Sequence, residues 1–112
     1  DATQNTLRGL GYALGTEAAF REEAVVFLLA VPVGWFLAPS VAWYIAMLGS
    51  LLLVMAVELL NTAVEKLADH VAPERHPNIG RVKDYGSAAV ACTLLFAGLV
   101  WLAAFAAWAG LI

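Results

Sequence analysis

The strongest constraint on this sequence is a long C-terminal segment, residues 85–112, that contains no charged residue. A helix of that length, rising about 1.5 Å per residue, can cross the roughly 30 Å hydrocarbon core of a bilayer with some tilt. The 112-residue chain is 62% hydrophobic and 13% charged, and one small soluble core cannot bury that much apolar surface. We therefore expect an all-α integral membrane protein with a single domain, residues 1–112.

Two more segments, residues 23–38 and residues 41–57, have the apolar composition of membrane helices. The first is too short to cross a bilayer alone, so its helix is expected to begin near Glu17, and Pro32 is expected to kink it. The second continues as a helical pattern with charges to about residue 70, so we expect this helix to extend beyond the bilayer. The predicted transmembrane helices are residues 23–38, 41–70 and 85–111.

The remaining segments are amphipathic or polar. Residues 5–22 combine an apolar helical stripe with flanking charges, which is typical of a helix that lies in the membrane interface. Residues 72–83 contain Pro73, Pro77 and Gly80 among clustered charges and are expected to form a loop. Asp84 can then cap the last helix. The residues thus predict one interfacial helix followed by three transmembrane helices.

The basic residues indicate how the chain is oriented in the membrane. Arg8 and Arg21 precede the first span, and the other basic residues surround the loop at 72–83, whereas the turn at 38–40 has no charge. Because cytoplasmic loops carry the excess of Lys and Arg, we expect a cytoplasmic N-terminus and an outer C-terminus. The net charge of −3 argues against nucleic-acid binding, and the single Cys92 excludes a disulfide within the chain. The outer end would carry the aromatic residues Trp35, Trp43, Tyr44 and Trp108.

One face of the second predicted span is polar at its cytoplasmic end. Acidic residues inside a membrane helix are costly and usually functional, although a buried polar contact between helices is an alternative. Several acids on one face would repel each other without a cation, and carboxylate and amide oxygens suit Mg²⁺. Toward the outer leaflet the same face is apolar, so this site would adjoin a groove suited to an amphiphilic substrate. At about 100° per residue, the face carries Glu58, Asn61, Thr62, Glu65 and Asp69, followed outward by Val54, Leu51 and Met47.

Polar residues also mark the cytoplasmic ends of the other two predicted spans. Taken alone, Glu17 and Arg21 are better explained as an i,i+4 ion pair, and Asp84 as a helix cap. A site is indicated only because these residues are expected at the same depth in the membrane as Glu23, Lys83 and Ser87. His70 and His76 are expected at the surface, and no zinc-site spacing, P-loop or protein-kinase motif is present.

Three segments resemble the bacterial diacylglycerol kinase family of integral-membrane lipid kinases: EAAFREE at 17–23, VELLNTAVEKLADHV at 57–71 and KDYGSAAV at 83–90. The resemblance runs in order from about residue 9 into the third predicted span. It implies a homotrimer in the bacterial inner membrane, with active sites shared between subunits. It also implies transfer of the γ-phosphoryl group of Mg-ATP to diacylglycerol, which gives phosphatidic acid.

The resemblance implies roles for residues at matching positions. Glu58 would accept the proton from the acceptor, with Asn61 in the same catalytic core, and Glu17 and Glu65 would bind the metal ion. The positions implied in nucleotide binding are Glu17, Glu65, Glu74, Arg75, His76, Lys83 and Asp84. The positions implied in binding the lipid acceptor are Ala19, Phe20, Arg21, Glu22, Glu23, Glu58 and Ser87.

Two other functions stay open at this point. The segment ELLNTAVE at 58–65 would also suit the undecaprenol kinases, which are close relatives within the same family. From a different class, a small oligomeric cation channel or an assembly scaffold would also place acids within a membrane. A channel needs a polar lining across the bilayer, however, and here the polar stripe ends at Val54.

Overall fold

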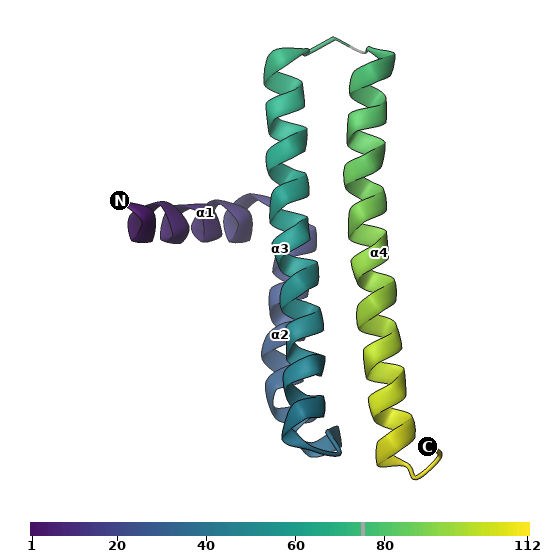
Figure 1. Cartoon of the computed structure of the whole chain (residues 1–112). Helices are drawn as coiled ribbons and strands as arrows, with labels where there is room; N and C mark the ends of the chain where they lie inside the picture. The colour runs from purple at the N-terminus through teal and green to yellow at the C-terminus, as the bar shows by residue number, and fades with distance from the viewer. Residues whose placement is uncertain (75) are drawn as a thin grey trace.

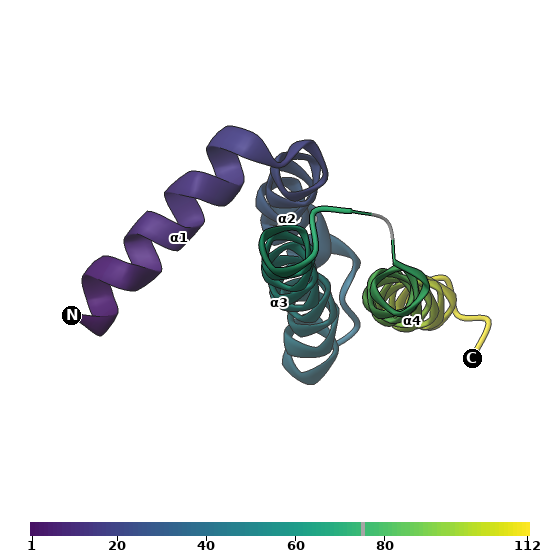
Figure 2. The ribbon, with the colours of Figure 1, turned by 90° about the horizontal axis from the view of Figure 1, so that it is seen from above.

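The chain folds into four α-helices in a computed structural model, which describes residues 1–74 and 76–112. Figure 1 shows α3 and α4 running antiparallel side by side, with α2 against the part of α3 that follows the α2–α3 turn. Viewed from above, α1 projects away from the other helices and lies far from α4 (Figure 2). No strand occurs in the part of the chain that the structure describes. The helices are α1 (Ala2–Thr16), α2 (Ala18–Leu37), α3 (Val41–Val71) and α4 (Pro77–Trp108).

Local side-chain hydrogen bonds define where three of these helices begin. Asp1 and Gln4 form a capping box at the start of α1, which satisfies backbone N–H groups that have no partner within the helix. The Ser40 hydroxyl accepts a hydrogen bond from the Trp43 amide at 3.2 Å and so caps α3. At the start of α4, Nδ1 of His76 accepts a hydrogen bond from the Asn78 amide at 3.1 Å.

The first helix boundary differs from the prediction of an interfacial helix over 5–22. Glu17 has an extended backbone, with φ −110° and ψ 106°, and separates α1 from α2. Residues 18–22 therefore belong to α2, which confirms that the helix through 23–38 begins near Glu17. Pro32 lies inside α2 without ending it.

The prediction of a loop over 72–83 capped by Asp84 is wrong. Helix α4 already begins at Pro77, and Asp84 lies within it. The physical reason is that proline is favoured in the first turn of a helix, where its missing N–H would have no partner in any case. His76, not Asp84, is the cap.

Two helices, α3 and α4, are long and apolar enough to cross a membrane, with mean hydropathies of 2.0 and 2.2 in their most apolar stretches. Helix α2 has 20 residues, but Arg21, Glu22 and Glu23 lie at its start. The third transmembrane helix thus stays a prediction.

The helices approach closely because small residues line their contacts. Most of the buried apolar residues are alanines, among them Ala30, Ala97 and Ala104, and small side chains allow helix backbones to come together in membranes. The indole N–H of Trp101 on α4 donates to the Met47 carbonyl of α3 at 3.1 Å. This bond and the alanine contacts hold α4 against α3.

We predict that Ala104→Leu destabilises the fold by about 1 to 3 kcal/mol, because a larger side chain at a fully packed contact forces the helices apart. Ala104 has an exposed fraction of 0%. Ala89→Leu, at an exposed position of the same helix, is the matched control. Reversible unfolding in detergent by a denaturing surfactant would measure both, and equal stability of the two variants would contradict the packing described here.

Candidate functional site

Four glutamates from three parts of the chain come together beside α3. Glu58 and Glu65 lie half-buried on α3, Glu23 is half-buried on α2, and Glu17 lies at the break between α1 and α2. The carboxyl groups of Glu23 and Glu58 lie within hydrogen-bonding reach of each other, and the charges of Glu17 and Glu65 also act on Glu58. We call Glu17, Glu23, Glu58 and Glu65 the acid cluster. Like charges this close require a shared proton or a cation.

Asn61 belongs to the same site and lies one turn from both α3 glutamates. Its amide Nδ2 donates to Glu65 Oε1 at 3.2 Å. Asn61 Oδ1 and Glu23 Oε1 are both buried, and neither has a hydrogen-bond partner among the residues described. A buried polar atom without a partner costs about 1 to 3 kcal/mol, so these two atoms mark the site as a place where polar groups are kept at a cost in stability.

Lys66 supplies the cation that faces Glu17. Its Nζ lies 3.6 Å from Glu17 Oε1, and its side chain is 67% exposed, so the pair is weak and open to solvent. In the sequence, Lys66 is one of the basic residues around the loop at 72–83 and serves only to orient the chain in the membrane. Its pair with Glu17 could not be predicted, because only the fold brings α3 beside the break at Glu17.

The i,i+4 ion pair expected between Glu17 and Arg21 is wrong. Instead, Nη1 of Arg21 donates to the Leu14 carbonyl at 3.1 Å, at the end of α1, where helix carbonyls have no partner within the helix. A cation there is also favoured by the helix dipole. Arg21 thus ties α2 to the end of α1.

A second polar group lies at the opposite end of α3 from the α2–α3 turn. Lys83 on α4 forms an ion pair with Asp69 on α3, and both line an open cavity of about 500 Å³ together with Glu74 and His76. His70 and His76 are exposed, which confirms their expected surface positions. Arg75, predicted to bind the nucleotide, lies outside the described residues.

An apolar groove begins beside the acid cluster, and Leu51 and Val54 line it as predicted, whereas Met47, predicted on the same face, is fully buried and does not line it. The groove has a volume of about 310 Å³ and joins Glu22 and Glu23 of α2 to Leu51 and Val54 of α3 and to Leu94 and Ala97 of α4. A second apolar cavity, of about 350 Å³, shares Leu51 and Ala97 with it and extends to Trp101. The contribution of α4 was not foreseen, because its residues show no polar signal in the sequence.

The other predicted acceptor residues lie in different environments. Ala19 lines the groove beside Glu22, whereas Phe20 is only 2% exposed and packs inside the chain. On α4, Asp84 and Ser87 are exposed. The structure therefore brings together Glu17, Glu23, Glu58, Asn61 and Glu65, and it places Lys83 in the separate cavity at the end of α3.

The donor set of the acid cluster fits Mg²⁺ that is bound together with a nucleotide. Within residues 1–74 and 76–112, no group of three or more His, Cys, Asp or Glu side chains has the geometry to hold a metal ion. Magnesium usually takes only one or two carboxylates and completes its coordination with water and substrate phosphates. A pair of carboxylates such as Glu17 and Glu65 would be enough on that basis.

Comparisons with known proteins agree with the resemblance found in the sequence. The profile of the family described as "Prokaryotic diacylglycerol kinase" matches residues 4–105. The chain is 44% identical over 101 residues to a diacylglycerol kinase of Haemophilus influenzae, covering 90% of this chain and 86% of that protein. It is 42% identical over 94 residues to the diacylglycerol kinase of Escherichia coli K12, covering 84% and 77%, and 35% identical over 94 residues to that of Helicobacter pylori, covering 83% and 73%. The chain therefore belongs to the prokaryotic diacylglycerol kinase family.

Proposed function

We propose that this lipid kinase transfers the γ-phosphoryl group of Mg-ATP to diacylglycerol, giving phosphatidic acid, at the cytoplasmic face of the bacterial inner membrane. The observation that carries the proposal is the acid cluster at the end of an apolar groove. An amphiphile with a hydroxyl group can place its chains in such a groove and its hydroxyl beside the carboxylates. Family membership supplies the kinase activity.

Glu58 is the residue that we assign as proton acceptor. It contacts Glu23, which lines the groove, so a hydroxyl at the end of the groove would come within reach of a carboxylate. The first requirement of a general base is that it lies within hydrogen-bonding distance of the hydroxyl whose proton it accepts. Phosphoryl transfer otherwise depends on positioning and charge neutralisation, which a small site can provide.

Glu17 and Glu65 would hold Mg²⁺ on the phosphates, and Asn61 would orient Glu65 through its amide hydrogen bond. When bound, Mg²⁺ neutralises charge that develops on the phosphates. Lys66 lies beside Glu17 and would face the same phosphates. The cavity lined by Glu74, His76 and Lys83 would receive the rest of the nucleotide, with Arg75 and Asp84 close by in sequence.

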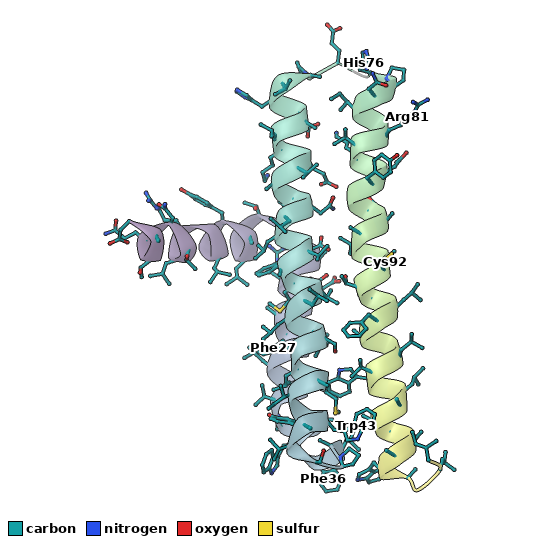
Figure 3. All side chains as sticks on the ribbon, in the orientation of Figure 1. Phe27, Phe36, Trp43, His76, Arg81 and Cys92 are labelled. Atoms are coloured by element: carbon teal, nitrogen blue, oxygen red, sulfur yellow. The ribbon has the colours of Figure 1, made fainter. Side chains whose placement is uncertain are left out.

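We further propose that α2, α3 and α4 all cross the membrane and that α1 lies in the cytoplasmic interface. A cavity of about 440 Å³ between α1 and α3 is lined on α3 by Leu59, Thr62, Ala63 and Lys66, so α1 meets α3 well before α3 ends at Val71. Figure 3 shows Phe36 and Trp43 at one end of the molecule and His76 and Arg81 at the other. Aromatic residues at the outer interface and basic residues inside match a cytoplasmic N-terminus and an outer C-terminus.

A homotrimer would cover surface that a single chain leaves open. Large apolar side chains are exposed along every helix, including Leu28 on α2, Leu52 on α3 and Leu95 on α4. Lipid or neighbouring copies of the chain would cover such side chains. The small residues Ala88 and Ala91 of α4 are exposed and offer surfaces for close helix contact between copies.

The acceptor can be tested directly by supplying diacylglycerol or undecaprenol in mixed micelles with Mg-ATP. We expect phosphatidic acid to form faster than undecaprenyl phosphate at equal acceptor concentration. A preference for undecaprenol would overturn the assignment of diacylglycerol as the acceptor. Ion flux in liposomes without ATP turnover would overturn the proposed kinase reaction. Light scattering of the same detergent-solubilised sample should give the mass of a trimer, which an active monomer would contradict.

Glu58→Gln should lower kcat by about 10² to 10⁴, because the amide keeps the shape of the side chain but cannot accept a proton. Nucleotide binding and the oligomeric state should be retained, and both would be measured on the purified variant. Turnover like that of the unmodified enzyme in a folded Glu58→Gln protein would remove Glu58 from this role.

Glu17→Gln and Glu65→Gln should each raise the Mg²⁺ concentration needed for half-maximal activity. Since both carboxylates would bind one ion, the double variant should lose much less than the product of the two single losses. Separate structural roles would instead give additive losses that appear in thermal stability, with Mg²⁺ dependence unchanged.

A further inference from the structure

Helix α4 passes so close to Asn61 at Gly86 that a side chain at position 86 would fit only if Asn61 moved. A Cβ atom built on Gly86 would overlap Asn61 Oδ1 and would lie 3.1 Å from Asn61 Cγ. At Gly49, Gly80 and Gly98, by contrast, an added Cβ would meet no atom within 4 Å. Gly86 is thus set apart from these other helical glycines of α3 and α4 by its contact with one particular side chain.

The contact restricts how the Asn61 side chain can be oriented. The amide group is planar, so the position of Oδ1 against α4 determines where Nδ2 points. In the structure Nδ2 points at Glu65 Oε1, at 3.2 Å, and Oδ1 is buried without a hydrogen-bond partner among the described residues. Nothing other than the packing against α4 is seen to hold Oδ1, so the space above Gly86 determines the direction of the donor.

We infer that Gly86 is a positioning residue that leaves room on α4 for the Asn61 amide and thereby fixes the Glu65 carboxylate toward the metal ion. The inference rests on the proposed function, in which Glu65 binds Mg²⁺. A methyl group at position 86 would rotate the Asn61 side chain or push α3 and α4 apart. In both cases the hydrogen bond to Glu65 is lost, and Glu65 has to be ordered when the metal binds.

The expected effect is on metal affinity more than on the fold. Removing a hydrogen-bond partner of a metal ligand typically costs about 10- to 100-fold in metal affinity. If Gly86 served only helix packing, replacing it would change the stability of the fold but would leave the metal affinity of the folded enzyme unchanged. The two roles are therefore separated by measuring metal binding on protein that is shown to be folded.

The test compares Gly86→Ala with Gly49→Ala in the full-length enzyme in detergent. Both changes replace glycine by alanine inside a long helix, so they share the gain in helix propensity, and Gly49 is exposed and faces no atom within 4 Å. Binding of Mn²⁺ in the presence of a non-hydrolysable ATP analogue, followed by electron paramagnetic resonance, reports the site without turnover. We expect Gly86→Ala to weaken Mn²⁺ binding by about 10-fold or more and Gly49→Ala to leave it unchanged.

A double-variant cycle shows whether the effect passes through Asn61. Asn61→Ala removes the atoms that a methyl group at position 86 would strike, so adding Gly86→Ala to Asn61→Ala should cause no further loss of Mn²⁺ affinity. If Gly86→Ala alone fails to fold, the double variant should fold and bind Mn²⁺ as Asn61→Ala does. Additive losses, or a double variant that also fails to fold, would overturn the inference.

Glu65→Gln separates this inference from the proposed function. If Glu65→Gln weakens Mn²⁺ binding while Gly86→Ala does not, only the role of Gly86 is wrong. If Glu65→Gln leaves Mn²⁺ binding unchanged, the metal site assigned to Glu65 is wrong, and the positioning role of Gly86 falls with it.

Discussion

The close contact between α3 and α4 is the interaction on which the rest of the structure depends. Alanines at Ala97 and Ala104 and the missing side chain at Gly86 let the two backbones approach, and the Trp101 indole ties α4 to the Met47 carbonyl. With lipid as solvent there is little hydrophobic force between helices, so packing and hydrogen bonds must supply the association. The polar face of α3 and the groove beside it both have α4 as a wall.

Burying the carboxylates of the acid cluster costs free energy, and the position of the cluster at the edge of the apolar region lowers this cost. Glutamates in hydrocarbon are expensive, yet Glu17 and Lys66 lie where α1 meets α3, with Lys66 open to solvent. Glu23 and Glu58 lie further along the same site and face each other. The cluster therefore runs from an exposed ion pair to half-buried carboxylates, which matches a water-soluble donor on one side and a lipid acceptor on the other.

Periodicity predicted the elements of this fold well, because a stripe of Glu58, Asn61 and Glu65 can be recognised only on a helix. Helix ends were harder to predict. Glu17 breaks the chain with an extended backbone, and Pro77 begins α4 within what resembled a loop. The pairs Glu17–Lys66 and Arg21–Leu14 join segments that no local pattern connects. The same is true of Gly86 and Asn61, whose relation depends on the register between two helices.

The length of α3 has a consequence for how two incompatible substrates meet. Glu58 and Asp69 are separated by about 16 Å along the helix axis, and the end of α3 lies beyond the level at which α1 packs. In the proposed reaction, a polyanionic nucleotide could then stay in water while an oily acceptor stays in the bilayer. Only one phosphoryl group would cross the boundary between the two phases, so neither substrate would have to dissolve in the other's solvent.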